Sequence, residues 1–308
     1  MKPFENQTGI SVSNSKIQLV EIGYKNEKFC LDKIDEAYFE EQLNLKTDRE
    51  TKIISTLQSA YNEITFKSPL HSKSLSFALP FELFYSMQVP YDNTLLHRDL
   101  IEEFRWEFSV LYPMADVENF SIQYIEVEKN NMIGKNTAIV VGIERKWISL
   151  FEKFCKQNNL KLGFIDNLHF ASERALSVNS IFILRGLILN IFLSSKFVSV
   201  LLSFNRKPFY FRIIPIDNFS EVPSLLTGEL TSGAGLNINK NSIDAAFVSG
   251  EDVSETTIYH LTSALGIHFQ IFNPFEKIKP DLNLLKNPLY VQKNNSFAAA
   301  AGIAYRLA

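Results

Sequence analysis

The feature that most constrains this fold is a pattern of three short strands and a helix that occurs twice. Six apolar or alternating runs separated by polar turns are strand candidates. They are Ile10–Val12, Ile17–Gly23 and Lys28–Asp32 near the start, and Leu187–Leu193, Phe197–Ser203 and Phe209–Pro215 in the second half. A helix is predicted after each set, over Thr47–Glu63 and over Pro223–Thr231. Strands and helices repeated in this order predict a duplicated α/β architecture with a cleft between its halves.

A strand–helix–strand–strand unit is inserted in the first copy. Its elements are predicted at Ser74–Leu79, Arg98–Leu111, Phe120–Val127 and Thr137–Ile143, and an apolar loop after Pro80 joins the first two. We therefore expect three parts. Residues 1–73 with 159–186 form the first half, residues 74–158 form the inserted subdomain, and residues 187–308 form the second half.

Composition and charge exclude several classes of function. The chain has 308 residues and a formal net charge of −3, so no broad basic surface for nucleic acid is expected. Its two cysteines lie far apart and its five histidines lack metal-ligand spacing, so neither a disulfide framework nor a metal site is expected. The motifs of P-loop, dinucleotide-binding and serine-hydrolase sites are absent from the sequence.

The apolar stretch Ile181–Phe204 is long enough to suggest a membrane span. Arg185, Asn190 and Lys196 interrupt it, and Ser194-Ser195 fits a turn, so we interpret it from Leu187 on as two strands. The N-terminus has no basic region followed by an apolar stretch, so no secretory signal is expected. These features predict a cytoplasmic location.

Four groups of residues share an order and spacing that covers nearly the whole chain. They are Glu102–Glu107 (EEFRWE) with Leu111-Tyr112-Pro113 and Val117–Phe120, then Ala138–Ile143, then Phe164–Leu176, and finally Phe297–Arg306 (FAAAAGIAYR). Together they resemble the PilM family of actin-like type IV pilus assembly proteins. The resemblance implies an actin-like, ribonuclease H-like duplicated fold with an inserted subdomain. It also implies a cytoplasmic protein that meets the inner membrane through a partner.

Actin-like ATPases hold ATP between two hairpins and an adenosine loop, whose glycines let the backbone approach the nucleotide. The matching positions here are Ser13, Asn14 and Ser15 in the first hairpin, Asn190, Ser194 and Ser195 in the second, and Gly250 in the adenosine loop. The family's first aspartate falls near Ser11 or Val12, and Asn190 replaces its second aspartate. The turn glycines are missing from both hairpins.

Further departures concern size and charge in the same cleft. Phe192 and Leu193 stand where the family has small residues, and Glu251-Asp252 adds negative charge at the adenosine loop. The helical subdomain that the family builds as one wall of the cleft is reduced here to a short insert at about 217–243. These departures predict a pseudo-ATPase with no catalytic residues, no bound ATP or magnesium and no metal site.

The resemblance implies a scaffold that binds the short N-terminal cytoplasmic peptide of a PilN-like bitopic protein. The groove for this peptide is expected between the first half and the insert, along Ser74–Leu79, Arg98–Leu111 and Leu168–Leu176. The candidate contact residues are Phe81, Phe84, Tyr85, Met87, Phe104 and Phe108, for which packing in the core is the alternative. The resemblance also allows contact with a cytoplasmic motor ATPase and self-association.

Two other functions stay open at this point. The first is a working actin-like ATPase or filament protein in which other residues replace the lost turns, and calorimetry with Mg-ATP distinguishes it. The second is a relative of the cytoplasmic region of GspL, a type II secretion protein that also has an actin-like fold. That family continues into a transmembrane segment, and this sequence ends at Ala308 without one, which favours the PilM interpretation.

Overall fold

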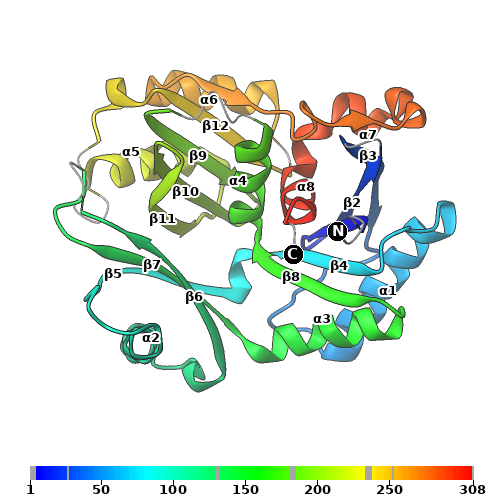
Figure 1. Ribbon diagram of the computed structural model, residues 1–308. Helices are drawn as coiled ribbons and strands as arrows, with labels where there is room; N and C mark the ends of the chain where they lie inside the picture. The colour runs from blue at the N-terminus through cyan, green and yellow to red at the C-terminus, as the bar shows by residue number, and fades with distance from the viewer. Residues whose placement is uncertain are drawn as a thin grey trace.

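The computed structural model describes residues 5–25, 28–129, 132–179, 185–232, 238–251 and 253–306. Two large sheets enclose a pair of helices, and a smaller third sheet projects from the first half (Figure 1). Among the described residues, no helix has the length and apolar character that crossing a membrane requires.

The first sheet contains six strands in the order β14-β3-β2-β1-β4-β8. They are β1 (Gln7–Val12), β2 (Lys16–Lys25), β3 (Lys28–Tyr38), β4 (Ser74–Leu79), β8 (Lys161–Asn167) and β14 (Lys279–Pro280). The meander β1-β2-β3 is antiparallel, whereas β4 runs parallel to both β1 and β8. Helices α1 (Glu50–Lys67) and α3 (Arg145–Gln157) cover one face, where Leu57 and Phe154 pack with Ile10 and Phe77.

The second sheet repeats the first. Its strands are β9 (Leu187–Leu193), β10 (Phe197–Phe204), β11 (Lys207–Pro215), β12 (Ala245–Gly250) and β13 (Phe269–Ile271). Their order, β11-β10-β9-β12-β13, and their pairing directions match those of β3-β2-β1-β4-β8. The predicted duplication is therefore confirmed, and the stretch that could have suggested a membrane span forms β9 and β10 from Leu187 on.

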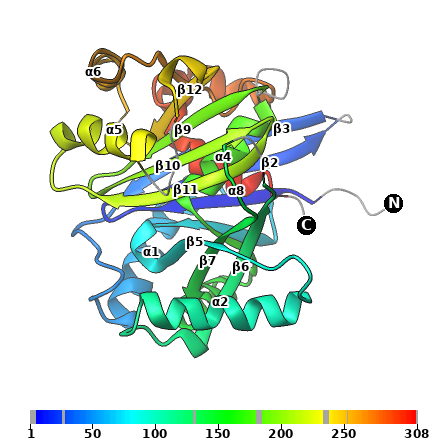
Figure 2. The same ribbon diagram turned by 90° about the vertical axis from the view of Figure 1, so that its left-hand side faces the viewer.

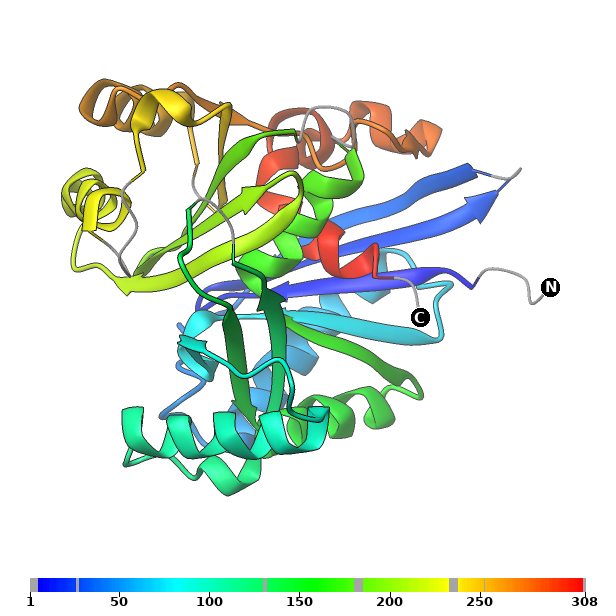
Figure 3. The same ribbon diagram turned by 60° about the vertical axis from the view of Figure 1, so that its left-hand side comes forward.

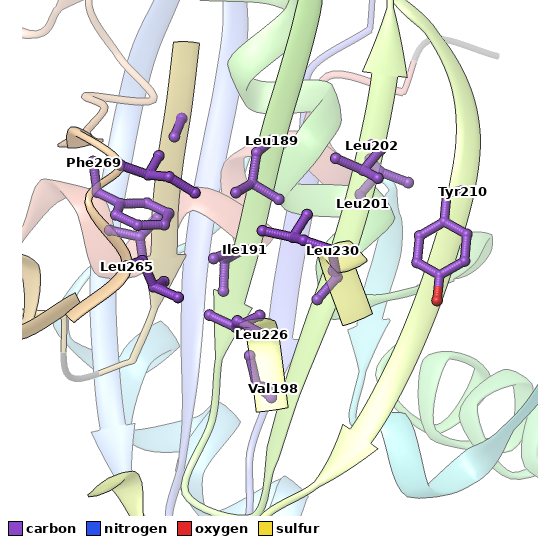
Figure 4. Packing of buried hydrophobic residues seen from close by; sticks show 14 of the residues in the cluster. Leu189, Ile191, Val198, Leu201, Leu202, Tyr210, Leu226, Leu230, Leu265 and Phe269 are labelled. Carbon is purple, nitrogen blue, oxygen red and sulfur yellow. The ribbon is translucent and has the colours of Figure 1, made fainter. Parts of the chain in front are cut away.

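The outer face of the second sheet is covered by α5 (Val222–Ser232) and α6 (Glu255–Leu265). Figure 4 shows Leu226 and Leu230 of α5 against Leu189 and Ile191 of β9, with Leu265 at the edge of the cluster. Every residue of β9 is buried because both faces of the sheet are covered, which explains why this strand has no alternating pattern.

Helices α4 (Leu168–Asn179) and α8 (Ala298–Ala304) lie between the two sheets (Figure 3). All seven residues of α8 are buried, and six of them are alanine or glycine. A Cβ atom at Gly302 would lie 1.6 Å from the Ala171 backbone oxygen, so this glycine sets the close approach of α4 and α8. The small-residue sequence at the end of the chain is thus explained by helix packing. The segment from Lys279 to Phe297 holds β14, two 3-10 turns and one short helix, α7 (Pro288–Gln292).

The inserted subdomain is a three-stranded sheet with one helix. Its strands β5 (Phe84–Pro90), β6 (Phe120–Val127) and β7 (Thr137–Glu144) have the order β5-β7-β6, and α2 (His97–Leu111) covers one face (Figure 2). The expected limits of residues 74 and 158 were too wide. Strand β4 belongs to the first sheet and α3 packs against it, so the insert comprises Phe84–Glu144.

The prediction of a loop after Pro80 was also wrong. A 3-10 turn at Phe81–Leu83 leads directly into β5, which pairs with β7. Tyr85, Met87 and Val89 alternate along β5 and pack on the α2 side of the sheet. This alternation, which ends at Pro90, is visible in the sequence and indicates a strand.

Candidate functional site

The two hairpins that match the phosphate loops lie at equivalent places, between β1 and β2 and between β9 and β10. The Ser13 hydroxyl accepts hydrogen bonds from the backbone N–H groups of Ser15 and Lys16, at 3.3 and 3.2 Å. In the second hairpin the Ser194 hydroxyl accepts from the N–H of Phe197 at 3.1 Å. Both serines therefore stabilise their own turns, as serine commonly does in hairpins.

The inner part of the cleft between the hairpins is closed by Phe192. Its side chain is 3% exposed, and its ring centroid lies 5.6 Å from that of Phe81 in an edge-on contact. Leu168 and Ala299 belong to the same apolar cluster. The cavity that remains beside it measures about 10 Å³, which is close to the smallest space that holds one water molecule. A phosphate group does not fit there.

Lys16, the cation at the end of the first hairpin, is neutralised within the protein. Its ammonium group lies 3.0 Å from the Glu36 carboxylate, which also accepts from Gln18 and pairs with Lys293 at 3.3 Å. Burial acts to lower the pKa of Lys16, but the hydrogen bond and charge of Glu36 outweigh it, and the pKa is raised. Burial likewise acts to raise the pKa of Glu36, and Lys16 and Lys293 together lower it.

The outer part of the cleft is open but acidic. It measures about 680 Å³ and is bordered by both hairpins, including Ser13, Asn14, Ser15, Ser194 and Ser195. Glu82, Asp217 and Glu251 line it, against the single ammonium group of Lys196. Three carboxylates and one cation repel a triphosphate rather than attract it.

The remaining two residues of the expected nucleotide site lie within strands of the second sheet. Asn190 is 2% exposed in the middle of β9 and lines neither cavity of the cleft. Gly250 has a φ of 147°, and a Cβ atom there would lie 2.1 Å from the Leu193 backbone oxygen. The approach of β12 to β9 alone therefore requires glycine at this position.

A second concave site lies between the inserted sheet and the first half. It is a groove of about 440 Å³, bounded by the face of the inserted sheet opposite α2, by β8 and by α4. Apolar side chains form most of its wall: Ile139, Val141, Ile143, Ile148, Leu162, Phe164, Ile165 and Phe170. Strands β6 and β8 are both edge strands of their sheets, so unpaired backbone groups border the groove on two sides.

Two arginines and one aspartate form a charged cluster in the groove wall. Asp166 accepts hydrogen bonds from Arg174 at 3.3 Å and from Arg306 at 3.2 Å, all through its Oδ2 atom. The guanidinium of Arg306 also lies 4.6 Å from the centroid of the Phe164 ring. Burial raises the pKa of Asp166, although the two arginines partly offset it. Two guanidinium groups on one carboxylate retain donors for an additional acceptor.

The expected partner residues are divided between three places. Phe84 lines both the groove and a separate opening beside β5 and β11, and Tyr85, Met87 and Phe81 border that opening alone. Phe104 and Phe108 have no exposed surface, because they form the core between α2 and the inserted sheet. Their expected role as contact residues is therefore corrected to core packing.

The expected groove walls are corrected as well. Of the three predicted segments only Leu168–Leu176 lines the groove, through Phe170, Glu173 and Arg174. The groove face formed by β6 and β7 was not predicted from the sequence. Residues 139, 141 and 143 alternate with the core positions Ala138 and Val140, so an apolar second face was visible in β7 once α2 was assigned to the first.

No family model matches the sequence, and no curated protein sequence matches it. Solved structures do match the fold. A structure described as the PilM-PilN type IV pilus biogenesis complex superposes with a TM-score of 0.71 and 16% sequence identity, over 97% of this chain and 98% of that chain. The chain has the actin-like fold in the form that PilM has. A Bacteroides thetaiotaomicron protein of unknown function with an actin-like ATPase fold matches with a TM-score of 0.56 and 11% identity, over 97% and 95% of the two chains.

The actin-like fold also matches the cytoplasmic domain of EpsL, an inner-membrane component of the type II secretion system of Vibrio cholerae. The TM-score is 0.50 with 13% identity, over 88% of this chain and 98% of that chain. At sequence identities this low, the structural matches establish a shared fold and nothing more. The predicted actin-like architecture is thus confirmed, and the function of this chain rests on its own residues.

Proposed function

We propose that this chain is a non-catalytic component of a type IV pilus or type II secretion assembly, in which it binds a short cytoplasmic segment of a PilN-like membrane protein. The segment would occupy the groove between β8 and the inserted sheet. The shared fold with a PilM-PilN complex supports this proposal, as does the fold match to an inner-membrane component of a secretion system.

The observation that carries the proposal is the open, mostly apolar groove. Its volume lies in the range of ligand pockets, and six of its eight apolar wall residues are only half-buried, with Ile139 and Ile143 buried. The edge strands β6 and β8 offer backbone donors and acceptors to an extended segment, while apolar side chains such as Val141 and Phe170 receive its apolar residues.

The state of the nucleotide cleft supports a role without catalysis. Hydrolysis of ATP requires phosphates and magnesium between the two hairpins, where Phe192 fills the inner space and Lys16 is paired with Glu36. We therefore expect neither ATP nor magnesium to bind. The chain would meet the membrane through its partner, and a motor ATPase or a second copy of the chain could join the same assembly.

A peptide titration tests the proposal. A labelled peptide with the N-terminal cytoplasmic sequence of the PilN-like partner is titrated against the protein, and fluorescence anisotropy reports binding. Val141→Asp places a charge in the apolar wall, so we expect its Kd to rise about a hundredfold, which corresponds to about 2.7 kcal/mol. Phe66→Asp is the matched control because Phe66 is 93% exposed on α1.

Equal affinity of the wild type and Val141→Asp would contradict the groove as the binding site. A similar loss in Phe66→Asp would show that added charge alone weakens binding. Circular dichroism of both variants checks that the fold is retained.

A further inference from the structure

Helix α2 carries two apolar stripes, and the fold uses one of them. Leu100, Phe104 and Phe108 recur at four-residue steps, are at most 3% exposed, and pack on the inserted sheet. The opposite side of α2 faces away from the rest of the molecule, as Figure 2 shows. A helix that only closed the small sheet would need no large apolar residues on that side.

The outer side nevertheless carries a second stripe. Trp106 and Val110 lie one turn apart and are 62% and 57% exposed, and Met114, just past the end of α2, is 98% exposed. Clustered exposed apolar residues of this size mark interaction surfaces, and tryptophan is among the residues that contribute most to binding at interfaces.

The charge around this outer stripe restricts what covers it. The segment His97–Asn119 contains six carboxylates and two arginines, a net charge of −4 in a chain whose total is −3. Of its two arginines, Arg105 is occupied in bonds to the backbone oxygens of Val117 and Glu118. Glu102 pairs with Arg105 at 3.8 Å, while Glu103 and Glu107 lie three residues before Trp106 and Val110, so carboxylates outnumber cations along the stripe.

This charge argues against two kinds of occupant. A second copy of the same face would bring two acidic surfaces together, and like charges in contact oppose association. An anionic membrane surface would repel the helix, because such surfaces attract lysine and arginine. A protein segment with apolar residues at helical spacing and basic residues beside them satisfies both the stripe and its border.

We propose that the outer face of α2 is a docking surface for a basic amphipathic helix of a protein partner. Trp106 and Val110 form its centre, and Met114 extends it beyond the end of the helix. The surface lies on the opposite face of the inserted sheet from the groove. It can therefore be occupied while the groove holds its own ligand, and the proposal does not depend on the proposed function.

The fluorescence of Trp106 reports binding, because the only other tryptophan of the sequence, Trp147, is 7% exposed. The probes are two synthetic helical peptides with leucine at the same positions, one with lysine and one with glutamate at all others. We expect the leucine–lysine peptide to shift the Trp106 emission to shorter wavelength. We also expect it to bind at least about tenfold more tightly than the leucine–glutamate peptide.

Variants locate the binding. Val110→Ser removes the centre of the stripe without adding charge, so we expect the affinity for the leucine–lysine peptide to fall about tenfold. Glu107→Gln should weaken binding by a smaller factor and reduce its dependence on salt. Phe66→Ser is the control, since it removes an exposed aromatic residue from α1.

Equal binding of the two peptides would overturn the proposal, as would a Val110→Ser protein that binds as well as Phe66→Ser. Analytical ultracentrifugation and vesicles containing phosphatidylglycerol complete the test. Self-association lost in Val110→Ser, or vesicle binding lost in that variant, would assign the surface to a different occupant and refute this proposal.

Discussion

The nucleotide cleft and the peptide groove share helix α4 but differ in what they can accept. Leu168 of α4 faces the cleft between the hairpins, whereas Phe170 and Arg174 face the groove. The inner cleft has shrunk to about 10 Å³ behind Phe192, while the groove retains about 440 Å³. We propose that one bulky residue at a close-approach position, together with an acidic lining, keeps nucleotide out of a cleft whose surrounding fold is intact. A fold therefore does not by itself preserve the chemistry of its cleft.

The largest effect is expected at the contact between α4 and α8, because a change there alters both sites at once. Gly302→Ala would place a methyl group 1.6 Å from the Ala171 backbone oxygen and separate α4 from α8, on which both sites depend. We expect the free energy of unfolding to fall by about 4 kcal/mol or more, measured by chemical denaturation.

Gly228→Ala is the matched control, because a Cβ atom at Gly228 of α5 meets nothing within 4 Å. It should be neutral or slightly stabilising, since alanine favours helix. A Gly302→Ala protein as stable as this control would show that the α4–α8 contact is not close.

The second prediction tests whether the bulk of Phe192 or the charge of the cleft prevents nucleotide binding. Phe192→Ala removes a buried ring, so we expect a loss of about 3 kcal/mol in the free energy of unfolding. We expect no binding of Mg-ATP, because Lys16 stays paired with Glu36 and the outer cleft stays acidic. Calorimetry on the variant is the measurement. Saturable ATP binding would mean that Phe192 alone closed the site.

The third prediction concerns the pH dependence of stability that His169 of α4 causes. His169 is fully buried next to the Phe192 ring, and burial lowers its pKa to about 3. The unfolded chain binds a proton at this residue below pH 6.5 and the folded chain does not, so stability falls as the pH falls from 6.5 toward 3. Between pH 7 and pH 5 we expect a loss of about 2 kcal/mol from this group.

Urea denaturation at the two pH values measures this loss. His169→Gln should show a flatter dependence on pH, whatever its absolute stability. Gly228→Ala, which changes no titratable group, is the comparison, and it should keep the wild-type slope. The same slope in His169→Gln and the wild type would contradict the assignment.

The smallest effect is expected at the charged end of the groove. Arg306→Gln removes one of the two guanidinium groups on Asp166, so we expect the partner peptide to bind about tenfold more weakly, about 1.4 kcal/mol. Arg98→Gln on α2 serves as the control for the loss of a positive charge. Unchanged affinity in Arg306→Gln would restrict the binding contribution to the apolar wall.

The order of strands was predictable because hydrophobic patterns and turns are local. The two meanders, the helix at Arg98–Leu111 and strands β6, β7, β9 and β10 lie where the sequence indicates them. The start of the insert was not predictable, because a 3-10 turn interrupts the apolar run after Pro80 before the run begins to alternate. Phe104 and Phe108 share one side of α2 by their spacing, but only the structure shows that this side packs on the sheet rather than facing a partner.

The site was predictable only in part for a related reason. The loss of turn glycines and the intrusion of Phe192 are visible position by position along the hairpins. The groove depends instead on which faces of β6, β7 and β8 oppose one another, and strand periodicity does not give the packing of separate sheets. The pairing of Lys16 with Glu36 likewise joins different strands of one sheet and has no local signal.

The central claim is that this chain binds its ligand in the groove and not between the hairpins. Isothermal titration calorimetry of one protein sample, first with Mg-ATP and then with the partner peptide, tests it most directly. The account predicts no saturable heat from Mg-ATP, followed by a saturable isotherm for the peptide with one site per chain. A one-to-one isotherm for Mg-ATP, with none for the peptide, would contradict it.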